Sequence, residues 1–155
     1  RSRGRGSSRL LLDTDRKTSE RLGRIRQRDT AAELAVRSSL YRMGIRFRTR
    51  NRDLPGSPDV ANRARRWVIF VHGCFWHRHE RCSRSSTPTR NRQFWIEKFR
   101  RNVERDRQQL RRLERDGFRV LVVWECESEN EPRLQHQLQR FFSRGRHDRA
   151  RRAKV

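Results

Sequence analysis

Apolar and polar positions along the first part of the chain predict a helix followed by a strand. Thr30 and Glu33 have the spacing of a capping box, and the apolar positions after them follow a helical period. This pattern ends at Gly44, so we predict a helix over 30–44. The segment 45–49 then alternates apolar and polar residues, as a half-buried strand does.

The remaining pattern predicts further strands and two more helices. The continuous apolar run 67–71 is typical of a buried central strand, and 118–124 predicts a second one. A short strand is predicted at 59–61. Helical periodicity predicts a long helix over 91–116 and a final amphipathic helix over 129–142. The predicted order, α-β-β-β-α-β-α, is that of a single α/β domain.

Composition adds a strong positive charge to this picture. The chain has 155 residues, 41 Lys and Arg against 18 Asp and Glu, and a formal net charge of +23. This charge indicates a polyanionic partner, with nucleic acid as the first candidate and an anionic membrane surface as the second. Both ends are basic, so we expect disordered arms at 1–14 and 143–155 and one domain over 15–142.

Several classes of protein are disfavoured by the same composition. No stretch approaches the 18 or more apolar residues of a membrane-spanning helix. The N-terminal region lacks the apolar segment of a secretion signal, so we expect a cytoplasmic protein with reduced thiols. The three cysteines cannot all pair within one chain.

Cysteine and histidine gather in one short segment. Residues 72–82 contain three of the five His and two of the three Cys. Cys74, His79 and Cys82 have spacings that allow tetrahedral zinc, and Cys126 lies just beyond the second buried strand. All four would form a closed structural zinc site. The alternative is a disulfide between Cys74 and Cys82, with Cys126 free and buried.

Two histidines of this segment, His72 and His77, are not needed for zinc. They either pack as ordinary core histidines or take part in the chemistry of the site. Of the two, His77 is the better candidate for proton transfer. Asp106 lies on the apolar face of the 91–116 helix, where burying an unpartnered carboxylate is costly. It either pairs with one of the many Arg residues or accepts the N–H of His77 and fixes its tautomer.

Asp59 is the other carboxylate of interest. It follows Pro58 in a Pro/Gly turn and opens a short predicted strand. Pro-Asp is a common turn pair, but an Asp at the second strand of this order, near the end of the third, can hold Mg²⁺ against a phosphodiester.

Together these residues resemble the very-short-patch-repair (Vsr) DNA mismatch endonucleases, a branch of the PD-(D/E)XK restriction-endonuclease-like fold. The resemblance spans roughly residues 16–127 in unbroken order. It is carried by RDTAAE at 28–33, LPGSPD at 54–59, VIFVHGCFWH at 68–77, FWIEK at 94–98, NVERDR at 102–107 and VLVVWEC at 120–126. Enzymes of this family cut the thymine strand of T:G mismatches, which arise when 5-methylcytosine deaminates within a methyltransferase site.

The resemblance implies roles for residues of the chemical site. Asp59 would be a direct Mg²⁺ ligand, with the backbone carbonyl of Val71 as the second protein ligand. His77 would be the general base and Asp106 would orient it. The hydrated metal or the phosphate would also be contacted by His72 and Glu33.

The resemblance also implies a structural zinc set and a DNA interface. The zinc ligands would be Cys74, His79, Cys82 and Cys126. Aromatic side chains of this family wedge into the base stack beside the mismatch, and Phe75 and Trp76 occupy those positions, although ordinary core packing is the alternative. The other implied DNA contacts are Leu22 (where the family usually has Met), Trp95, Lys98 and Asn102.

Three functions are therefore compared. The first is a Mg²⁺-dependent mismatch endonuclease that acts as a monomer on double-stranded DNA at the nucleoid and works alongside a DNA cytosine-5 methyltransferase. The second is a catalytically impaired, zinc-stabilised DNA-binding module. The third, a basic RNA-binding or ribosome-associated protein, does not account for Asp59, His77 and Asp106 together. We therefore prefer the first.

Overall fold

The computed structural model describes residues 29–152, with side chains described as far as Arg144. The predicted arm at 1–14, the predicted start of the domain at 15 and Leu22 lie outside the described residues. The elements are α2 (Ala31–Arg42), β1 (Val60–Asn62), β2 (Trp67–His72), the 3-10 turn η1 (Ser83–Ser85), α3 (Arg92–Arg115), β3 (Arg119–Trp124), α4 (Glu125–Ser128) and α5 (Glu131–Arg152).

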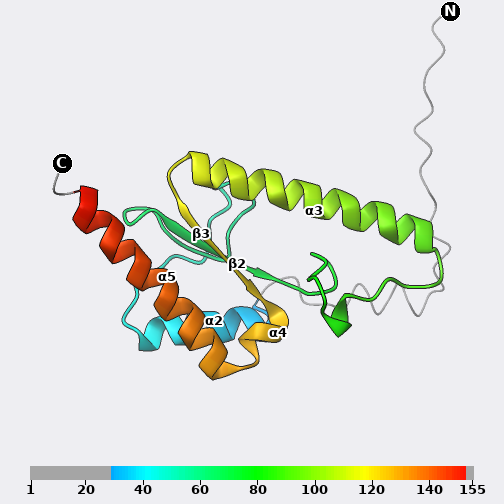
Figure 1. Cartoon of the computed structure of the whole chain (residues 1–155), viewed down its shortest axis with the longest axis horizontal. Coiled ribbons are helices and arrows are strands. Elements are labelled where there is room, and N and C mark those ends of the chain that lie inside the picture. Colours follow the sequence, from blue (N-terminus) through cyan, green and yellow to red (C-terminus); the bar gives the residue numbers. More distant parts are fainter. Residues whose placement is uncertain (1–28, 153–155) are drawn as a thin grey trace, which may run out of the picture.

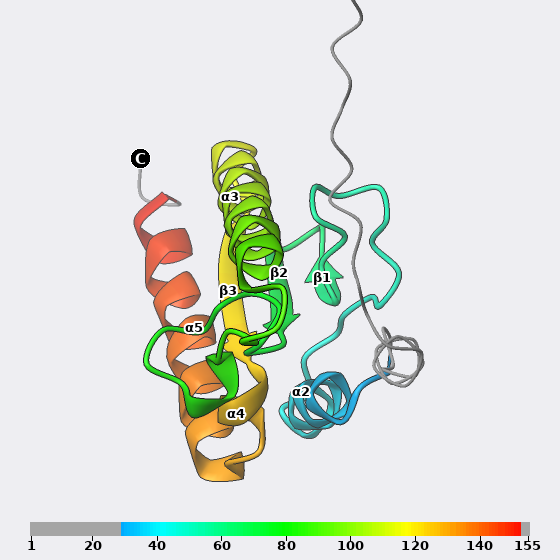
Figure 2. The same ribbon diagram turned by 90° about the vertical axis from the view of Figure 1, so that its right-hand side faces the viewer.

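The strands form one small sheet in the order β1-β2-β3. β1 and β2 are antiparallel, with Val60 opposite Ile69, whereas β2 and β3 are parallel, with Trp67 opposite Arg119. The parallel pair requires a crossover connection, and α3 supplies it. Figure 1 shows α3 on one side of the sheet and α2, α4 and α5 on the other, and Figure 2 shows the same layers turned by 90°.

The period of two along the strands divides the core between these layers. One cluster joins α2 and α5 to alternate strand residues and contains Val36, Leu40, Val60, Trp67, Ile69, Val123, Leu134 and Leu138. A second cluster joins the intervening strand residues to the C-terminal part of α3 and contains Ala61, Val68, Phe70, Leu113 and Phe118. His72 therefore belongs to the α3-facing set of β2, next after Phe70.

The helices predicted at 30–44 and 91–116 are confirmed as α2 and α3. Thr30 is the N-cap of α2, and its side chain accepts a hydrogen bond from the Glu33 N–H at 3.2 Å. Gly44 follows the helix with φ +66°, a left-handed conformation that glycine adopts without steric cost. The Thr30–Glu33 capping box therefore predicted the start of α2 correctly.

The strand predicted at 45–49 is wrong. Arg48 forms a single antiparallel bridge with Ala61, and no longer ladder develops because β1 has only three residues. The Asn62 side chain donates instead to the Arg46 carbonyl at 2.9 Å. The alternation still predicts correctly which side chains face the core, since Ile45 and Phe47 pack against the first core cluster. The order of described elements is consequently α-β-β-α-β-α-α.

The end of the chain also differs from the prediction. The helix predicted at 129–142 becomes α4 and α5, and the Asn130 side chain accepts the Arg133 N–H at 3.0 Å where α5 begins. α5 continues to Arg152, through most of the segment predicted as a disordered tail at 143–155. This segment contains no proline and is rich in Arg, a good helix former, so local sequence allows the helix to continue.

Candidate active site and metal centre

A cleft of about 530 Å³ opens where the C-terminal end of β2 meets the middle of α3. α2 contributes one wall and the loop before β1 another. All six residues predicted for the chemical site line this cleft. They are Glu33, Asp59, Val71, His72, His77 and Asp106.

His77 and Asp106 form a direct pair in the cleft. The His77 Nδ1 lies 2.5 Å from the Asp106 Oδ2, and the Asp106 side chain is only 12% exposed. Burial raises the pKa of Asp106, but the hydrogen bond from His77, together with the charges of His77, His72 and Arg105, outweighs burial and lowers the pKa overall. An ionised carboxylate can only accept, so in the neutral His77 ring the proton resides on Nδ1 and the Nε2 lone pair is free. The predicted pairing of Asp106 with His77 is thus present.

His72 stacks directly on His77. The two ring centroids are 3.9 Å apart and the planes differ by 11°. Burial, together with the charge of His77, lowers the pKa of His72 to about 4. His72 is therefore neutral at neutral pH, and it does not oppose a positive charge on the neighbouring His77 ring.

Asp59 lies at the edge where β1 and β2 separate. The ladder ends at the Val60–Ile69 pair, and beyond it the Asp59 Oδ2 accepts the Val71 N–H at 2.6 Å. Burial raises the pKa of Asp59 to about 6, against the opposing effect of this N–H. The carboxylate is therefore a desolvated group, and a nearby cation would stabilise its ionised form.

Glu33 reaches the same cleft from the first turn of α2. It is only 7% exposed, and its carboxylate accepts hydrogen bonds from the Asp29 N–H at 3.0 Å and the Arg37 guanidinium at 3.1 Å. Its Oε1 also lies 3.1 Å from the Thr30 hydroxyl. The Glu33 carboxylate therefore belongs both to the capping box at the start of α2 and to the wall of the cleft.

The four predicted zinc ligands converge beside this cleft. The side-chain ligand atoms of Cys74, His79, Cys82 and Cys126 all lie within 4.8 Å of one another. All three cysteines are free thiols, so the alternative disulfide is not formed. Burial raises the pKa of the Cys74 thiol to about 12. Three sulfurs and one imidazole nitrogen at these separations fit a tetrahedral Zn²⁺, whose ligands lie about 2.0–2.3 Å from the ion.

Trp124 connects the two groups of residues and was missed by the sequence analysis. The His79 ring stacks on it at 4.3 Å with an 8° angle between planes, while the His72 ring meets it edge-on at 5.5 Å. Trp124 is opposite His72 in the β2–β3 register. Its position at the end of a buried strand, two residues before Cys126, was the available signal, but only the register shows which histidines it contacts.

Aromatic side chains form a third group at the outer side of the loop. The Phe75 ring contacts Trp76, Trp95 and Phe99 at centroid distances of 5.0–5.6 Å. The Lys98 ammonium lies 5.1 Å from the Trp76 ring. Phe75 and Trp76 are half-buried, and Trp95 is buried. Part of this aromatic group is therefore packed in the protein interior. These side chains are more buried than freely exposed wedges would be.

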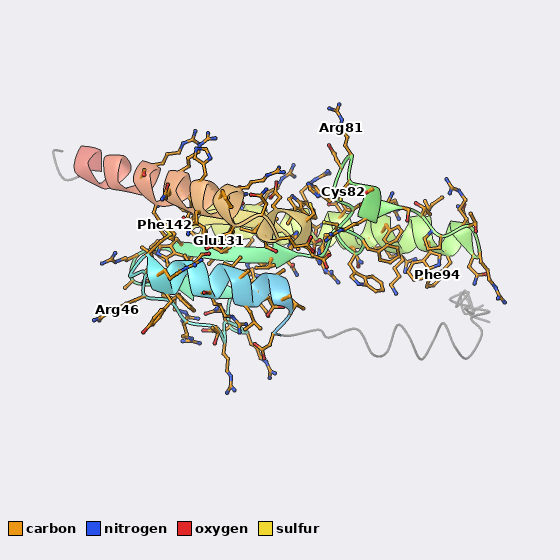
Figure 3. The ribbon with its side chains drawn as sticks, turned by 90° about the horizontal axis from the view of Figure 1, so that it is seen from below. Arg46, Arg81, Cys82, Phe94, Glu131 and Phe142 are labelled. Carbon is orange, nitrogen blue, oxygen red and sulfur yellow. The ribbon has the colours of Figure 1, made fainter. Side chains whose placement is uncertain are left out.

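The same loop is tied to α3 by Asn102, whose Nδ2 donates to the Trp76 carbonyl at 3.3 Å. Figure 3 shows that α3 extends beyond the sheet, with Phe94 near that end and Cys82 on the adjacent loop. The predicted residues Trp95, Lys98 and Asn102 thus lie on one helix next to the loop that carries Trp76. Leu22 lies outside the described residues.

Within residues 29–152, no helix combines the length and the apolar character needed to cross a bilayer.

Comparisons with known proteins find related DNA endonucleases. A family model described as DNA mismatch endonuclease Vsr matches residues 12–84. The DNA mismatch endonuclease Vsr of Escherichia coli is 46% identical over 108 residues, which cover 70% of this chain and 69% of that protein. The type II nicking enzyme V.XorIIP of Xanthomonas oryzae is 43% identical over 118 residues, covering 74% of this chain and 86% of the enzyme. The chain therefore belongs to the Vsr family of DNA mismatch endonucleases and is an endonuclease that nicks DNA.

Proposed function

We propose that this protein is a Mg²⁺-dependent endonuclease that nicks the thymine strand at T:G mismatches in duplex DNA. Such mismatches arise by deamination of 5-methylcytosine, so the enzyme would accompany a DNA cytosine-5 methyltransferase. The observation that carries the proposal is the convergence of Asp59 and the His77–Asp106 pair in one cleft. The relatives are named as a mismatch endonuclease and a nicking enzyme, which supports mismatch recognition and nicking. Asp59, His77 and Asp106 would carry out the hydrolysis.

The residues around Asp59 fit a Mg²⁺ ion. The Asp59 carboxylate accepts the Val71 N–H, and the N–H and C=O of one strand residue point toward the same neighbour. The Val71 carbonyl therefore faces the side on which Asp59 lies, and Mg²⁺ takes such oxygen ligands. When bound, the ion would stabilise the charge that develops on the phosphate. Glu33 and His72 line the same cleft and would hold its water or the phosphate.

The His77–Asp106 pair is arranged for proton transfer. With its proton on Nδ1, His77 presents the Nε2 lone pair and removes a proton from the attacking water. The water oxygen then forms a bond to phosphorus as the bond to the leaving sugar oxygen breaks. Asp106 holds the ring in this tautomer and stabilises the imidazolium that forms. His72, being neutral, adds no repulsion to that charge.

The His77→Ala substitution is expected to lower the nicking rate by roughly 10²- to 10⁴-fold, the usual contribution of a general base. Single-turnover nicking of a T:G duplex at saturating enzyme measures this rate without contribution from binding. His136→Ala is the matched control, because His136 is exposed on α5 and lines a different groove. A His77→Ala rate within a few-fold of the wild type would contradict the role of His77 as the base.

The Cys/His cluster would hold a structural zinc ion. All four ligands come from the protein, which leaves no open position for a substrate. Cys74 and Cys82 bracket the loop that carries Phe75, Trp76 and His77, and Cys126 joins that loop to α4. Zinc would therefore fix the loop that supplies both the base and the aromatic side chains.

Recognition of the mismatch would use the aromatic group beside the cleft. Phe75 and Trp76 would wedge into the base stack, and Lys98 and Asn102 would contact the backbone nearby. A mismatched step costs less to unstack than a paired one, so a wedge favours mismatched DNA. The ring contacts of Phe75 with Trp95 and Phe99 would give the wedge rigid support. Leu22 would act from the opposite groove.

The Trp76→Ala substitution is expected to reduce the preference for T:G over T:A duplex by about tenfold, since stacking contributes about 1–3 kcal/mol per base. Competition binding at a fixed salt concentration measures the preference. Tyr41→Ala is the control, because Tyr41 is 81% exposed on α2 and does not line the cleft. An unchanged preference in Trp76→Ala would exclude Trp76 from mismatch recognition.

The same competition tests the proposed function against the RNA-binding hypothesis. We expect T:G duplex to compete best, fully paired duplex less well and RNA duplex least. All three affinities should fall steeply with salt, because counterion release dominates binding by so basic a protein. Equal competition by RNA would contradict the proposed substrate.

A further inference from the structure

The loop over 51–58 carries Asp59 into the cleft, and it has no helix or strand of its own. Its base is closed by the Arg48–Ala61 bridge, in which the two backbone hydrogen bonds measure 2.8 and 3.0 Å. The position of the Asp59 carboxylate therefore depends on the contacts that keep this loop in one conformation.

Asn51 makes the central contacts inside the loop. It is 2% exposed, and its Nδ2 donates to the Arg48 carbonyl at 2.9 Å and to the Pro58 carbonyl at 3.0 Å. Both neighbours are carbonyl oxygens, so the amide nitrogen must face them. The Asn51 Oδ1 is buried and has no hydrogen-bond partner among the described residues. The amide thus uses both of its donors even though its acceptor is left unpaired.

The second acceptor of this amide adjoins the proposed metal ligand. Pro58 directly precedes Asp59 and is itself fully buried. The Asn51–Pro58 hydrogen bond therefore fixes the backbone one residue before Asp59, whose carboxylate then meets the Val71 N–H. Without this bond, the Pro58 carbonyl would lose its Asn51 partner and the loop would relax toward solvent.

The tip of the same loop is also closely fitted. Gly56 has φ +73°, and a Cβ there would lie 2.8 Å from the Gln109 Oε1 on α3. The tip therefore rests against α3, while Asn51 holds the base next to Asp59. Of the two contacts, the one at the base directly adjoins the residue that would bind the metal.

We propose that Asn51 is a positioning residue for the Mg²⁺ site. Its amide ties the start of the loop to the carbonyl before Asp59 and keeps the carboxylate in place for the ion. This inference rests on the proposed function, in which Asp59 is a metal ligand. It predicts that the loss of the Asn51 amide weakens Mg²⁺ binding more than it weakens the fold.

The test compares Asn51→Ala with Asn62→Ala in the full chain. Asn62 is a matched control, because its Nδ2 also donates to a backbone carbonyl, that of Arg46 at 2.9 Å, but at the far end of β1 from Asp59. Two quantities are measured for each variant. One is the Mg²⁺ concentration that half-saturates nicking, and the other is the rise in melting temperature on adding Mg²⁺ to the protein alone.

We expect Asn51→Ala to raise the half-saturating Mg²⁺ concentration by about 10- to 100-fold, as loss of a group that orients a metal ligand usually does. It should also remove most of the Mg²⁺-induced rise in melting temperature, with zinc content unchanged. Asn62→Ala should lower the melting temperature without Mg²⁺ and leave the half-saturating concentration as in the wild type. If Asn51→Ala does not fold, Asn51→Ser retains one donor and should show a smaller increase.

The same measurements on Asp59→Ala distinguish failure of the Asn51 inference from failure of the metal assignment. A variant of Asn51 that binds Mg²⁺ like the wild type, while Asp59→Ala loses the response, would overturn the role of Asn51 and leave the metal site in place. A normal Mg²⁺ response in Asp59→Ala would instead overturn the metal assignment on which the inference rests.

Discussion

The Asp59→Ala protein is expected to bind a T:G duplex normally and not to nick it. The substitution removes the carboxylate that would hold Mg²⁺ at the phosphate but touches none of the aromatic residues beside the cleft. Metal stabilisation of a phosphoryl transition state is worth several kcal/mol, so the rate should fall by about 10³-fold or more. Nicking and binding are measured on the same labelled duplex.

The control for this substitution is Asp53→Ala in the same loop. Asp53 is exposed and pairs with Arg48 and Arg63 at the surface, where ion pairs contribute little to stability. Nicking by Asp53→Ala should therefore stay close to that of the wild type. If Asp59→Ala retained nicking at a comparable level, Asp59 would not be the metal ligand.

The second large effect is expected from Cys126→Ser. Cys126 would be the zinc ligand that joins the loop after β2 to α4, and its Sγ lies 3.3 Å from the His79 Nδ1. Closed zinc sites contribute directly to folding free energy, and the loss of one ligand removes much of that contribution. We expect zinc content to fall below one ion per chain and the melting temperature to drop by about 10 °C or more.

A zinc chelator provides the control for the cysteine substitution. Chelation should lower the melting temperature of the wild type toward that of Cys126→Ser and should have little effect on the variant. An unchanged melting temperature and full zinc content in Cys126→Ser would exclude a four-ligand site. Added Zn²⁺ should raise the melting temperature of the wild type after chelation but not that of the variant.

Much of the helical framework could be predicted because its signals are local. The Thr30 capping box and the spacing of apolar residues on the long helix act within a few turns of chain. That spacing also showed Asp106 on the apolar face, and the structure pairs it with His77. The segment 45–49 failed because alternation predicts which side chains are buried, whereas a strand also needs a partner of matching length.

The parts of the site that escaped prediction depend on contacts between distant segments. Trp124 meets His72 and His79 through the β2–β3 register, which neither strand specifies alone. Asn51 belongs to no predicted helix or strand, and its role depends on the fold of the loop around it. Clustering of cysteine and histidine in sequence identified the zinc candidates, but it gave no indication of these supporting residues.

Strand-specific nicking of a duplex with a single T:G mismatch in a methylated-cytosine context is the most direct test of the proposed function. Each strand carries a different label, a fully paired duplex is run in parallel, and Mg²⁺ is omitted by dialysis so that the zinc site is left intact. We expect one nick in the thymine strand, only in the mismatched duplex and only with Mg²⁺. Tight binding of the mismatch without cleavage would instead identify a DNA-binding module without catalysis, and equal cutting of paired DNA would contradict mismatch recognition.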